Sequence, residues 1–146
     1  MGRTDGSLVD RARYTVIAAF ALNLPWEFAQ MPLFEQHGGG DGRSIAFCLA
    51  AAIADALIAM VVVQIASATA RRSPLNAHNR APYLLSALFG AIAAVLFERM
   101  GIALHLWAYD ARMPIVFGIG AVPLVQLTLT IPLSLYLTRR LALGRV

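Results

Sequence analysis

The sequence contains no lysine, and it has few charged side chains of any kind. Of its 146 residues, 14% are charged and 59% are hydrophobic, and the mean hydropathy is +0.67, whereas about a quarter of the residues in an ordinary soluble domain are charged. The absence of lysine excludes Schiff-base chemistry. The net charge of +4 comes from arginines, which we assign to loops and not to a nucleic-acid surface. These features predict a single integral membrane domain, residues 1–146, that binds no nucleic acid.

Cysteine and histidine are also scarce. The single cysteine, Cys48, has no partner for an internal disulfide, and a thiol-relay enzyme of the quinone-reducing kind needs at least two. Three histidines, His37, His78 and His105, are too few for a di-iron oxygenase built on histidine clusters. The spacing of His105 and Glu98 makes them a weak pair of metal ligands. We therefore expect no metal and no cofactor.

Four hydrophobic segments are each long enough to cross a bilayer, which takes ~20 mainly apolar residues in a helix. They are residues 14–34, 44–70, 82–106 and 114–137. Glycines follow the first segment, and arginines follow the second and the fourth, as expected where helices end. The sequence thus predicts an all-α fold, an integral membrane bundle of four transmembrane helices.

Arginine placement predicts the orientation of these helices. The amino-terminal tail, the loop after the second segment and the carboxyl-terminal tail hold nine arginines, and three lie on the opposite side. Because positively charged loops stay in the cytoplasm, both termini are predicted to be cytoplasmic, in a bacterial inner membrane. Interfacial aromatics agree, with Tyr14, Tyr83 and Tyr136 at the predicted inner ends and Trp107 and Tyr109 at the outer end.

Polar side chains interrupt the predicted membrane helices at similar depths. Asn23, Glu27 and Gln30 follow one stripe of the first helix, at spacings of four and three residues. Asp55 lies near the middle of the second helix, and Gln126 lies at middle depth in the fourth. We expect these side chains to face the interior of the bundle, with Glu27 and Asp55 close enough to couple.

Three acids come from three different helices, and an acid in a membrane is costly and usually functional. We expect Glu27, Asp55 and Glu98 to be within reach of one pocket that opens to the outer side or to the outer leaflet. Close together in a low dielectric, they do not all stay ionised, so an acid and a base stand side by side. We name Glu27, Asp55 and Glu98 as candidate catalytic residues. The candidates for substrate binding are Asn23, Trp26, Gln30, Trp107, Tyr109 and Gln126.

Structural roles compete with these functional ones. The three amides among the candidates suit hydrogen bonding between helices. One alternative for Glu98 is an ion pair with the adjacent Arg99. Another is that its side chain extends so that the carboxyl group lies at the outer interface. Trp107 and Tyr109 suit anchoring at the membrane interface, and Cys48 suits packing.

Two resemblances bear on the substrate. The Trp26-Glu27 pair on the first helix resembles the Trp-Glu feature of membrane-bound terpene cyclases, in which a protonating carboxylate lies in a small helical bundle. A four-helix membrane unit with buried acids, an amide and an aromatic is also similar to the sterol-isomerase and sigma-2-receptor group. Both resemblances imply isoprenoid-like substrates that are handled by proton chemistry.

The sequence leaves three functions open. The first is an enzyme that isomerises, cyclises or hydrates a lipid-soluble isoprenoid or polyene, with Trp26 and Trp107 steadying a carbocation. The second is a proton-coupled transporter of the small four-helix type. Transporters of this type are dimers that often insert in both orientations, whereas the arginine bias of this sequence predicts one orientation. The third is a structural membrane subunit. The expected partner is a membrane lipid or lipid-like substrate, and a second copy of the chain is a further candidate.

Overall fold

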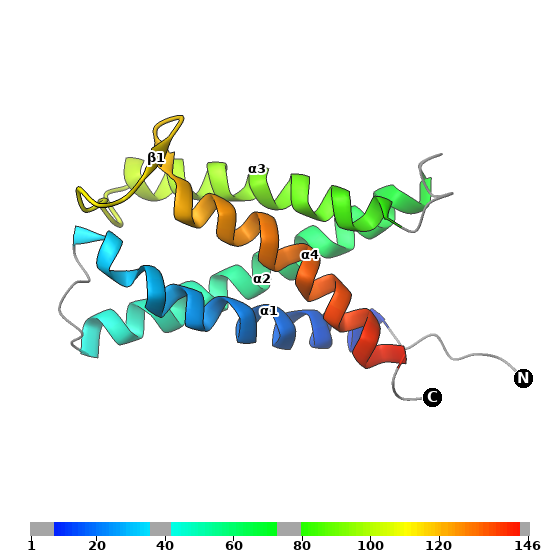
Figure 1. The fold of residues 1–146 in the computed structure, drawn as a ribbon. Helices are drawn as coiled ribbons and strands as arrows, with labels where there is room; N and C mark the ends of the chain where they lie inside the picture. Colours follow the sequence, from blue (N-terminus) through cyan, green and yellow to red (C-terminus); the bar gives the residue numbers. More distant parts are fainter. Residues whose placement is uncertain (1–7, 36–41, 73–79, 144–146) are drawn as a thin grey trace, which may run out of the picture.

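Four helices make up most of the computed structural model, which describes residues 8–35, 42–72 and 80–143. The helices are α1 (Leu8–Gln30), α2 (Gly42–Arg72), α3 (Ala81–Ala103) and α4 (Ala121–Leu143). A short 3₁₀ helix, η1 (Met31–Leu33), extends α1, and a two-stranded antiparallel hairpin of β1 (Ile115–Val116) and β2 (Ile119–Gly120) precedes α4 (Figure 1).

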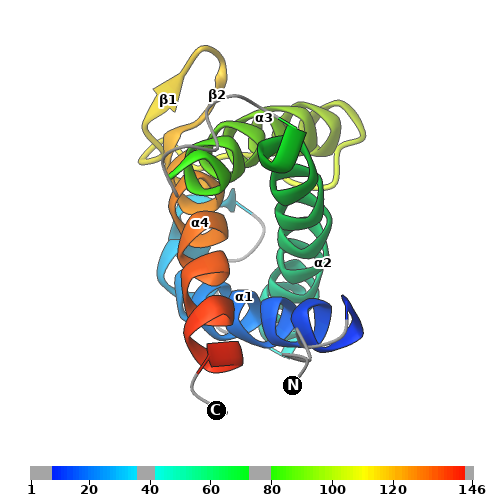
Figure 2. The same cartoon turned by 90° about the vertical axis from the view of Figure 1, so that its right-hand side faces the viewer.

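The helices form a ring, with α2 and α4 on opposite sides of it (Figure 2). Each helix packs against its two neighbours in the ring, and the shared core consists largely of small and branched residues: Ala19, Ala56, Ala59, Val62, Val63, Ala94, Leu127, Ile131 and Leu135. A Cβ atom on Gly90 of α3 would lie 2.7 Å from the carbonyl oxygen of Leu127 on α4. Glycine at this position therefore lets the two helices approach closely.

The ring has two distinct ends. At one end, α1 begins beside the last turns of α4, where the hydroxyl oxygens of Thr15 and Thr138 lie 3.2 Å apart. The other end, which we call the hairpin end, carries η1, residues 104–114 and the β hairpin (Figure 1). Helix α2 ends and α3 begins at the end where α1 begins, so consecutive helices run antiparallel (Figure 1).

Three of the described helices, α2, α3 and α4, are long and apolar enough to cross a membrane. Their outward faces carry exposed aliphatic side chains at four-residue intervals: Ile45, Leu49, Ile53, Leu57, Val61 and Ile65 on α2, Leu84, Leu88, Ile92 and Leu96 on α3, and Val125, Leu129 and Leu133 on α4. Continuous apolar surface of this kind is typical of a lipid-facing wall. Helix α1 is as long as α3 but less apolar, because Asn23, Glu27 and Gln30 interrupt it.

The largest correction to the predicted helices concerns residues 114–137. Residues 115–120 form the hairpin, and the fourth helix begins only at Ala121 and continues to Leu143. Phe117 and Gly118 have φ angles of +52° and +77°, and positive φ at both central residues is the type I′ geometry that favours tight hairpins. The hairpin sequence is as apolar as the first turn of a membrane helix, so hydropathy does not distinguish the two. The fold is therefore helical with one small hairpin.

The first and third helices also end earlier than predicted. Helix α1 begins at Leu8 and ends at Gln30, and the predicted helical residues after it form η1, with Pro32 in its first turn. Helix α3 ends at Ala103, since His105 takes a φ of +56°, which a continuing helix does not allow. The second helix agrees with the prediction to within two residues at each end.

Candidate functional site

The side-chain amide of Gln126, on α4, is the centre of a buried polar cluster. Its Nε2 atom lies 2.7 Å from Oε1 of Glu27 and 2.8 Å from Oδ2 of Asp55. It also lies 3.0 Å from Oδ1 of Asn23. Gln126 is 2% exposed and Asn23 is fully buried. Helices α1, α2 and α4 therefore meet at one amide nitrogen.

Neighbouring side chains fix the orientation of this cluster. Gln30 donates from Nε2 to Oε1 of Glu27 at 2.8 Å and to Oε1 of Gln126 at 2.9 Å. Asn23 donates to the backbone of its own helix, and its Oδ1 accepts a hydrogen bond from Thr130 at 3.1 Å. Gln30 and Gln126 therefore act as donors to the acids, while Asn23 donates to its own helix and accepts from Gln126.

The cluster has fewer amide hydrogens than acceptors. An amide nitrogen carries two hydrogens, and Nε2 of Gln126 faces three oxygens. The carboxyl oxygens of Glu27 and Asp55 both lie within 2.8 Å of that nitrogen, so the two acids are immediate neighbours, as expected from the sequence. Two carboxylates this close repel each other in a low dielectric. One proton shared by the pair relieves the repulsion and supplies the missing hydrogen.

Glu98, on α3, forms a separate polar centre. It is 8% exposed, and its Oε2 accepts hydrogen bonds from the hydroxyl of Tyr109 and, at 3.4 Å, from Nε1 of Trp107. The backbone N–H of Gly120 donates to the Tyr109 hydroxyl at 2.8 Å. Burial, together with the hydrogen bond to Glu98, raises the pKa of Tyr109 above its ordinary value, so the phenol stays a donor. These donors favour the carboxylate form of Glu98.

Glu98 thus bonds to Trp107 and Tyr109, and not to Arg99, the adjacent partner that the sequence suggested. The guanidinium of Arg99 instead donates to the carbonyl oxygen of Phe117 at 3.4 Å. Trp107 lies against Gly101, where a Cβ atom would be 2.0 Å from the indole ring. Trp107 and Tyr109 are therefore positioned as hydrogen-bond donors to a buried acid, and their role is not limited to anchoring at an interface.

A cavity of about 280 Å³ lies between the two polar centres. The three acids, Glu27, Asp55 and Glu98, all line it, and so do Gln30 and Gln126. Most of the remaining wall is apolar: Met31, Phe34, Phe47, Cys48, Ala50, Ala51, Ala54, Ile58, Ala94, Phe97, Trp107, Pro123 and Leu127. An apolar cavity with a few convergent polar groups is typical of a small-molecule site.

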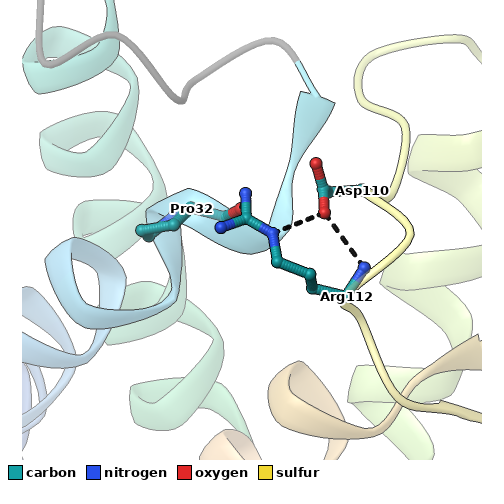
Figure 3. Close-up of polar contacts among 3 residues, drawn as sticks. All are labelled: Pro32, Asp110 and Arg112. Carbon is teal, nitrogen blue, oxygen red and sulfur yellow. Dashed lines mark hydrogen bonds and ion pairs between the residues drawn. The ribbon is translucent and has the colours of Figure 1, made fainter.

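The cavity is covered at the hairpin end by contacts that we call the cap, between residues 31–35 and 107–112. Two backbone hydrogen bonds join them, from Glu35 to Ala108 at 3.0 Å and from Asp110 to Leu33 at 2.9 Å. Figure 3 shows Arg112 between the two segments. Its Nη2 donates to the carbonyl oxygen of Pro32 at 2.7 Å, and its Nε lies 2.7 Å from Oδ1 of Asp110. The Arg112 side chain lowers the pKa of the Asp110 carboxyl.

The structure separates the predicted substrate-binding residues into two groups. Gln30, Trp107 and Gln126 line the cavity. Asn23, Trp26 and Tyr109 lie outside its wall; Asn23 and Tyr109 support residues that do line it. The indole N–H of Trp26 is buried and has no hydrogen-bond partner among the described residues. The sequence does not distinguish Phe34, Phe47 and Phe97 as wall residues, since phenylalanine is an ordinary component of membrane helices.

Within residues 8–35, 42–72 and 80–143, no group of three or more His, Cys, Asp or Glu is arranged to hold a metal ion. Comparisons of the chain with models of protein families, with curated proteins and with solved structures find no match. The cavity and its three acids are therefore the features from which we infer a function.

Proposed function

We propose that this protein is an integral membrane enzyme that protonates and deprotonates a lipid-soluble isoprenoid or polyene, and so isomerises, cyclises or hydrates it. One observation carries the proposal: a pair of adjacent acids and a separate third acid line the same apolar cavity. Acid–base catalysis requires two groups whose surroundings favour opposite protonation states. The carboxyls of Glu27 and Asp55 meet at one donor nitrogen and can hold a proton between them, whereas Glu98 accepts two hydrogen bonds that offset part of the cost of burying its charge.

The proposal includes a fourth membrane span, α1, with both termini in the cytoplasm of a bacterial cell. Helix α1 packs against α2 and α4, and its polar residues find partners inside the bundle, as a spanning helix requires. The end of the bundle where α1 begins carries the arginine-rich side of the sequence. The hairpin end carries three arginines, Arg43, Arg99 and Arg112. This asymmetry supports the orientation in which the hairpin faces outward.

The reaction begins with transfer of the shared proton to a carbon–carbon double bond. The π electrons form the new C–H bond, and the neighbouring carbon becomes a carbocation. Glu98 then removes a proton from a carbon next to the cation, and the electrons of that C–H bond form the shifted double bond. If another double bond attacks the cation first, a ring forms and the positive charge moves to a new carbon, next to which Glu98 removes a proton. If a water molecule attacks, Glu98 removes a proton from the resulting oxonium and the product is an alcohol. Return of the proton from Glu98 to the pair completes the cycle.

The wall of the cavity suits a cationic intermediate. The rings of Phe47 and Trp107 lie 6.3 Å apart, nearly perpendicular to each other, and both line the cavity. Aromatic faces attract cations, and they do so more strongly where water is excluded. Among the described residues, none that lines the wall is basic, so no described wall side chain repels a developing positive charge.

Deuterium transfer tests the proposal without knowledge of the exact substrate. The purified protein is placed in vesicles that contain polyprenyl lipid, in D₂O buffer, and carbon-bound deuterium in the lipid is measured by mass spectrometry. We expect incorporation with the wild type and less than about a tenth of it with Glu27→Gln, which keeps the size of the side chain but loses the transferable proton. Glu35→Gln removes an exposed acid of the cap and serves as the matched control.

Three results would distinguish the functions. Incorporation that is lost in Glu27→Gln and Glu98→Gln at unchanged melting temperature supports the enzyme. Proton-driven efflux from vesicles without any deuterium in the lipid would point to a transporter. If the wild type shows neither activity with polyprenyl lipid or total membrane lipid, and Glu27→Gln keeps its stability, the polar cluster is structural and the proposal is wrong.

A further inference from the structure

The cavity reaches the lipid-facing surface of the bundle between α2 and α3. Three of its wall residues are themselves exposed: Ala50 and Ala54 on α2, and Phe97 on α3, which is 41% exposed. The acids Glu27 and Glu98 on the same wall are buried. Figure 1 shows α2 and α3 lying apart toward the hairpin end, where these residues are, and converging toward the other end. The cavity therefore opens sideways.

The depth of this opening indicates what passes through it. Ala54 lies twelve residues after the start of α2, which is ~18 Å along a helix ~46 Å long. The opening is thus well inside the apolar span, far from both ends of the helix. A polar headgroup at that depth would lose its hydration at a cost of several kcal/mol, whereas a hydrocarbon chain loses nothing. The occupant that fits is hydrocarbon.

The exposed wall residues of α2 are small, whereas several other exposed positions on this helix carry large aliphatic side chains. Ile53, Leu57 and Val61 are among these, and each is about half exposed. At the opening the helix carries Ala50 and Ala54 instead, directly in front of the cavity. The cap meanwhile covers the hairpin end through the contacts of residues 31–35 with 107–112. The cap thus covers the cavity at the hairpin end, whereas exposed wall residues border its side. Entry from the side is therefore the favoured route.

We propose that the cavity binds the end of a long hydrocarbon chain of a membrane lipid, which enters sideways between α2 and α3 past Ala50, Ala54 and Phe97. The volume of about 280 Å³ is just below that of small-molecule sites, ~300–1,000 Å³. It encloses a chain terminus, while the rest of the lipid stays in the bilayer. This inference depends on the proposed function for the reaction that follows binding, but not for binding itself.

Tryptophan quenching by bromine tests the binding directly. The chain has two tryptophans, and Trp26→Phe leaves Trp107, which lines the cavity, as the single fluorophore. The protein is placed in vesicles of phosphatidylcholine whose acyl chains are brominated near the terminus, or near the headgroup in a parallel sample. Trp107 is the first residue of the 107–112 segment of the cap, so free lipid brings headgroup-proximal bromine near it. Chain-terminal bromine reaches it efficiently only when a chain end occupies the cavity.

Ala54→Phe fills the opening from the lipid-facing surface, where a larger side chain displaces lipid and not protein. We expect it to reduce quenching by chain-terminal bromine at least twofold, and Ala50→Phe to do the same if Ala54→Phe does not fold. Leu57→Phe is the matched control, because Leu57 is 50% exposed on the same helix and does not line the cavity. It should leave the quenching as in the parent protein.

Several outcomes would overturn this inference. Quenching that is equal in Ala54→Phe, Ala50→Phe and the parent shows that no chain enters there. Strong quenching of Trp107 by water-soluble acrylamide in the parent would show an aqueous route. Disulfide-linked dimers of Ala54→Cys would show that a second copy covers the opening. If deuterium transfer fails but quenching by chain-terminal bromine remains, the proposed function is wrong and the binding inference stands. If deuterium transfer occurs without such quenching, the binding inference is wrong and the proposed function stands.

Discussion

The side-chain nitrogen of Gln126 lies 2.7 Å from the carboxyl oxygen Oε1 of Glu27. This contact joins the most polar helix of the bundle, α1, to a helix that is apolar enough to cross a membrane on its own. The acid on α1 has its hydrogen-bond donors inside the protein, from Gln30 as well as from Gln126. Packing against α4 therefore provides the internal partners that allow α1 to lie in an apolar environment.

Replacement of Gln126 by leucine should destabilise the bundle. Glu27, Asp55 and Asn23 each lose a donor within 3.0 Å, and a buried polar group without a partner costs about 1–3 kcal/mol. We expect the free energy of unfolding in detergent to fall by at least ~2 kcal/mol. Thr128→Ala is the control on the same helix, because the Thr128 hydroxyl donates to the carbonyl oxygen of Leu124 in its own helix. Equal unfolding curves for the two variants would contradict the role given to Gln126.

Replacement of Gly101 by alanine should displace Trp107. The new Cβ atom would lie 2.0 Å from the indole ring, and overpacking of this kind costs about 1–3 kcal/mol. We expect a lower melting temperature and a red-shifted tryptophan emission as the ring moves off Glu98. Gly42→Ala is the matched control, since no atom lies within 4 Å of the position of its Cβ. An unchanged emission spectrum in Gly101→Ala would show that Trp107 does not depend on this glycine.

The sequence predicts the helices and the polar cluster because both follow from local spacing. Asn23, Glu27 and Gln30 share a helical face whatever that helix packs against, and their cost in lipid directs that face inward. Helix neighbours joined by short loops then bring Asp55 beside Glu27. Hydrogen-bond partners in the structure agree with this reasoning at each of these residues.

The sequence does not predict the hairpin end, because its structure depends on contacts between distant segments. Tyr109 meets Glu98 only after residues 104–114 fold back over α3, and its backbone pairs with Phe34 of a different segment. The apolar hairpin residues look like the start of a helix. Nothing local to Trp26 shows that its ring lies outside the cavity while Trp107 lies in its wall.

Titration of Tyr109 should be delayed to high pH. Burial and the hydrogen bond to Glu98 raise the pKa of its hydroxyl, so the folded protein holds this proton more tightly than the unfolded chain does. The stability that this group contributes is present below its ordinary pKa, ~10, and is lost as the pH rises through the raised value. The difference in tyrosinate absorbance between wild type and Tyr109→Phe isolates this residue. A difference spectrum that appears below pH ~10 would contradict the burial of this hydroxyl.

Chemical labelling of cysteines should show that α3 and α1 each cross the membrane. In a Cys48→Ala background, Phe117→Cys places a thiol at the tip of the hairpin, where Phe117 is 90% exposed, and Arg80→Cys places one just before α3. The 23 residues of α3 separate these sites by ~34 Å, about the thickness of the hydrocarbon core. A membrane-impermeant maleimide should label Phe117→Cys in intact cells and Arg80→Cys only after the cells are permeabilised.

The same experiment on α1 decides whether the bundle has four spans. Val9 is 74% exposed near the start of α1, and Glu35 is exposed just beyond η1. If α1 spans the membrane, Glu35→Cys is labelled from outside and Val9→Cys only after permeabilisation, because the arginine-rich end stays in the cytoplasm. Labelling of both sites from one side would place α1 along the membrane surface. Glu27 would then lack the low-dielectric surroundings that the shared proton requires.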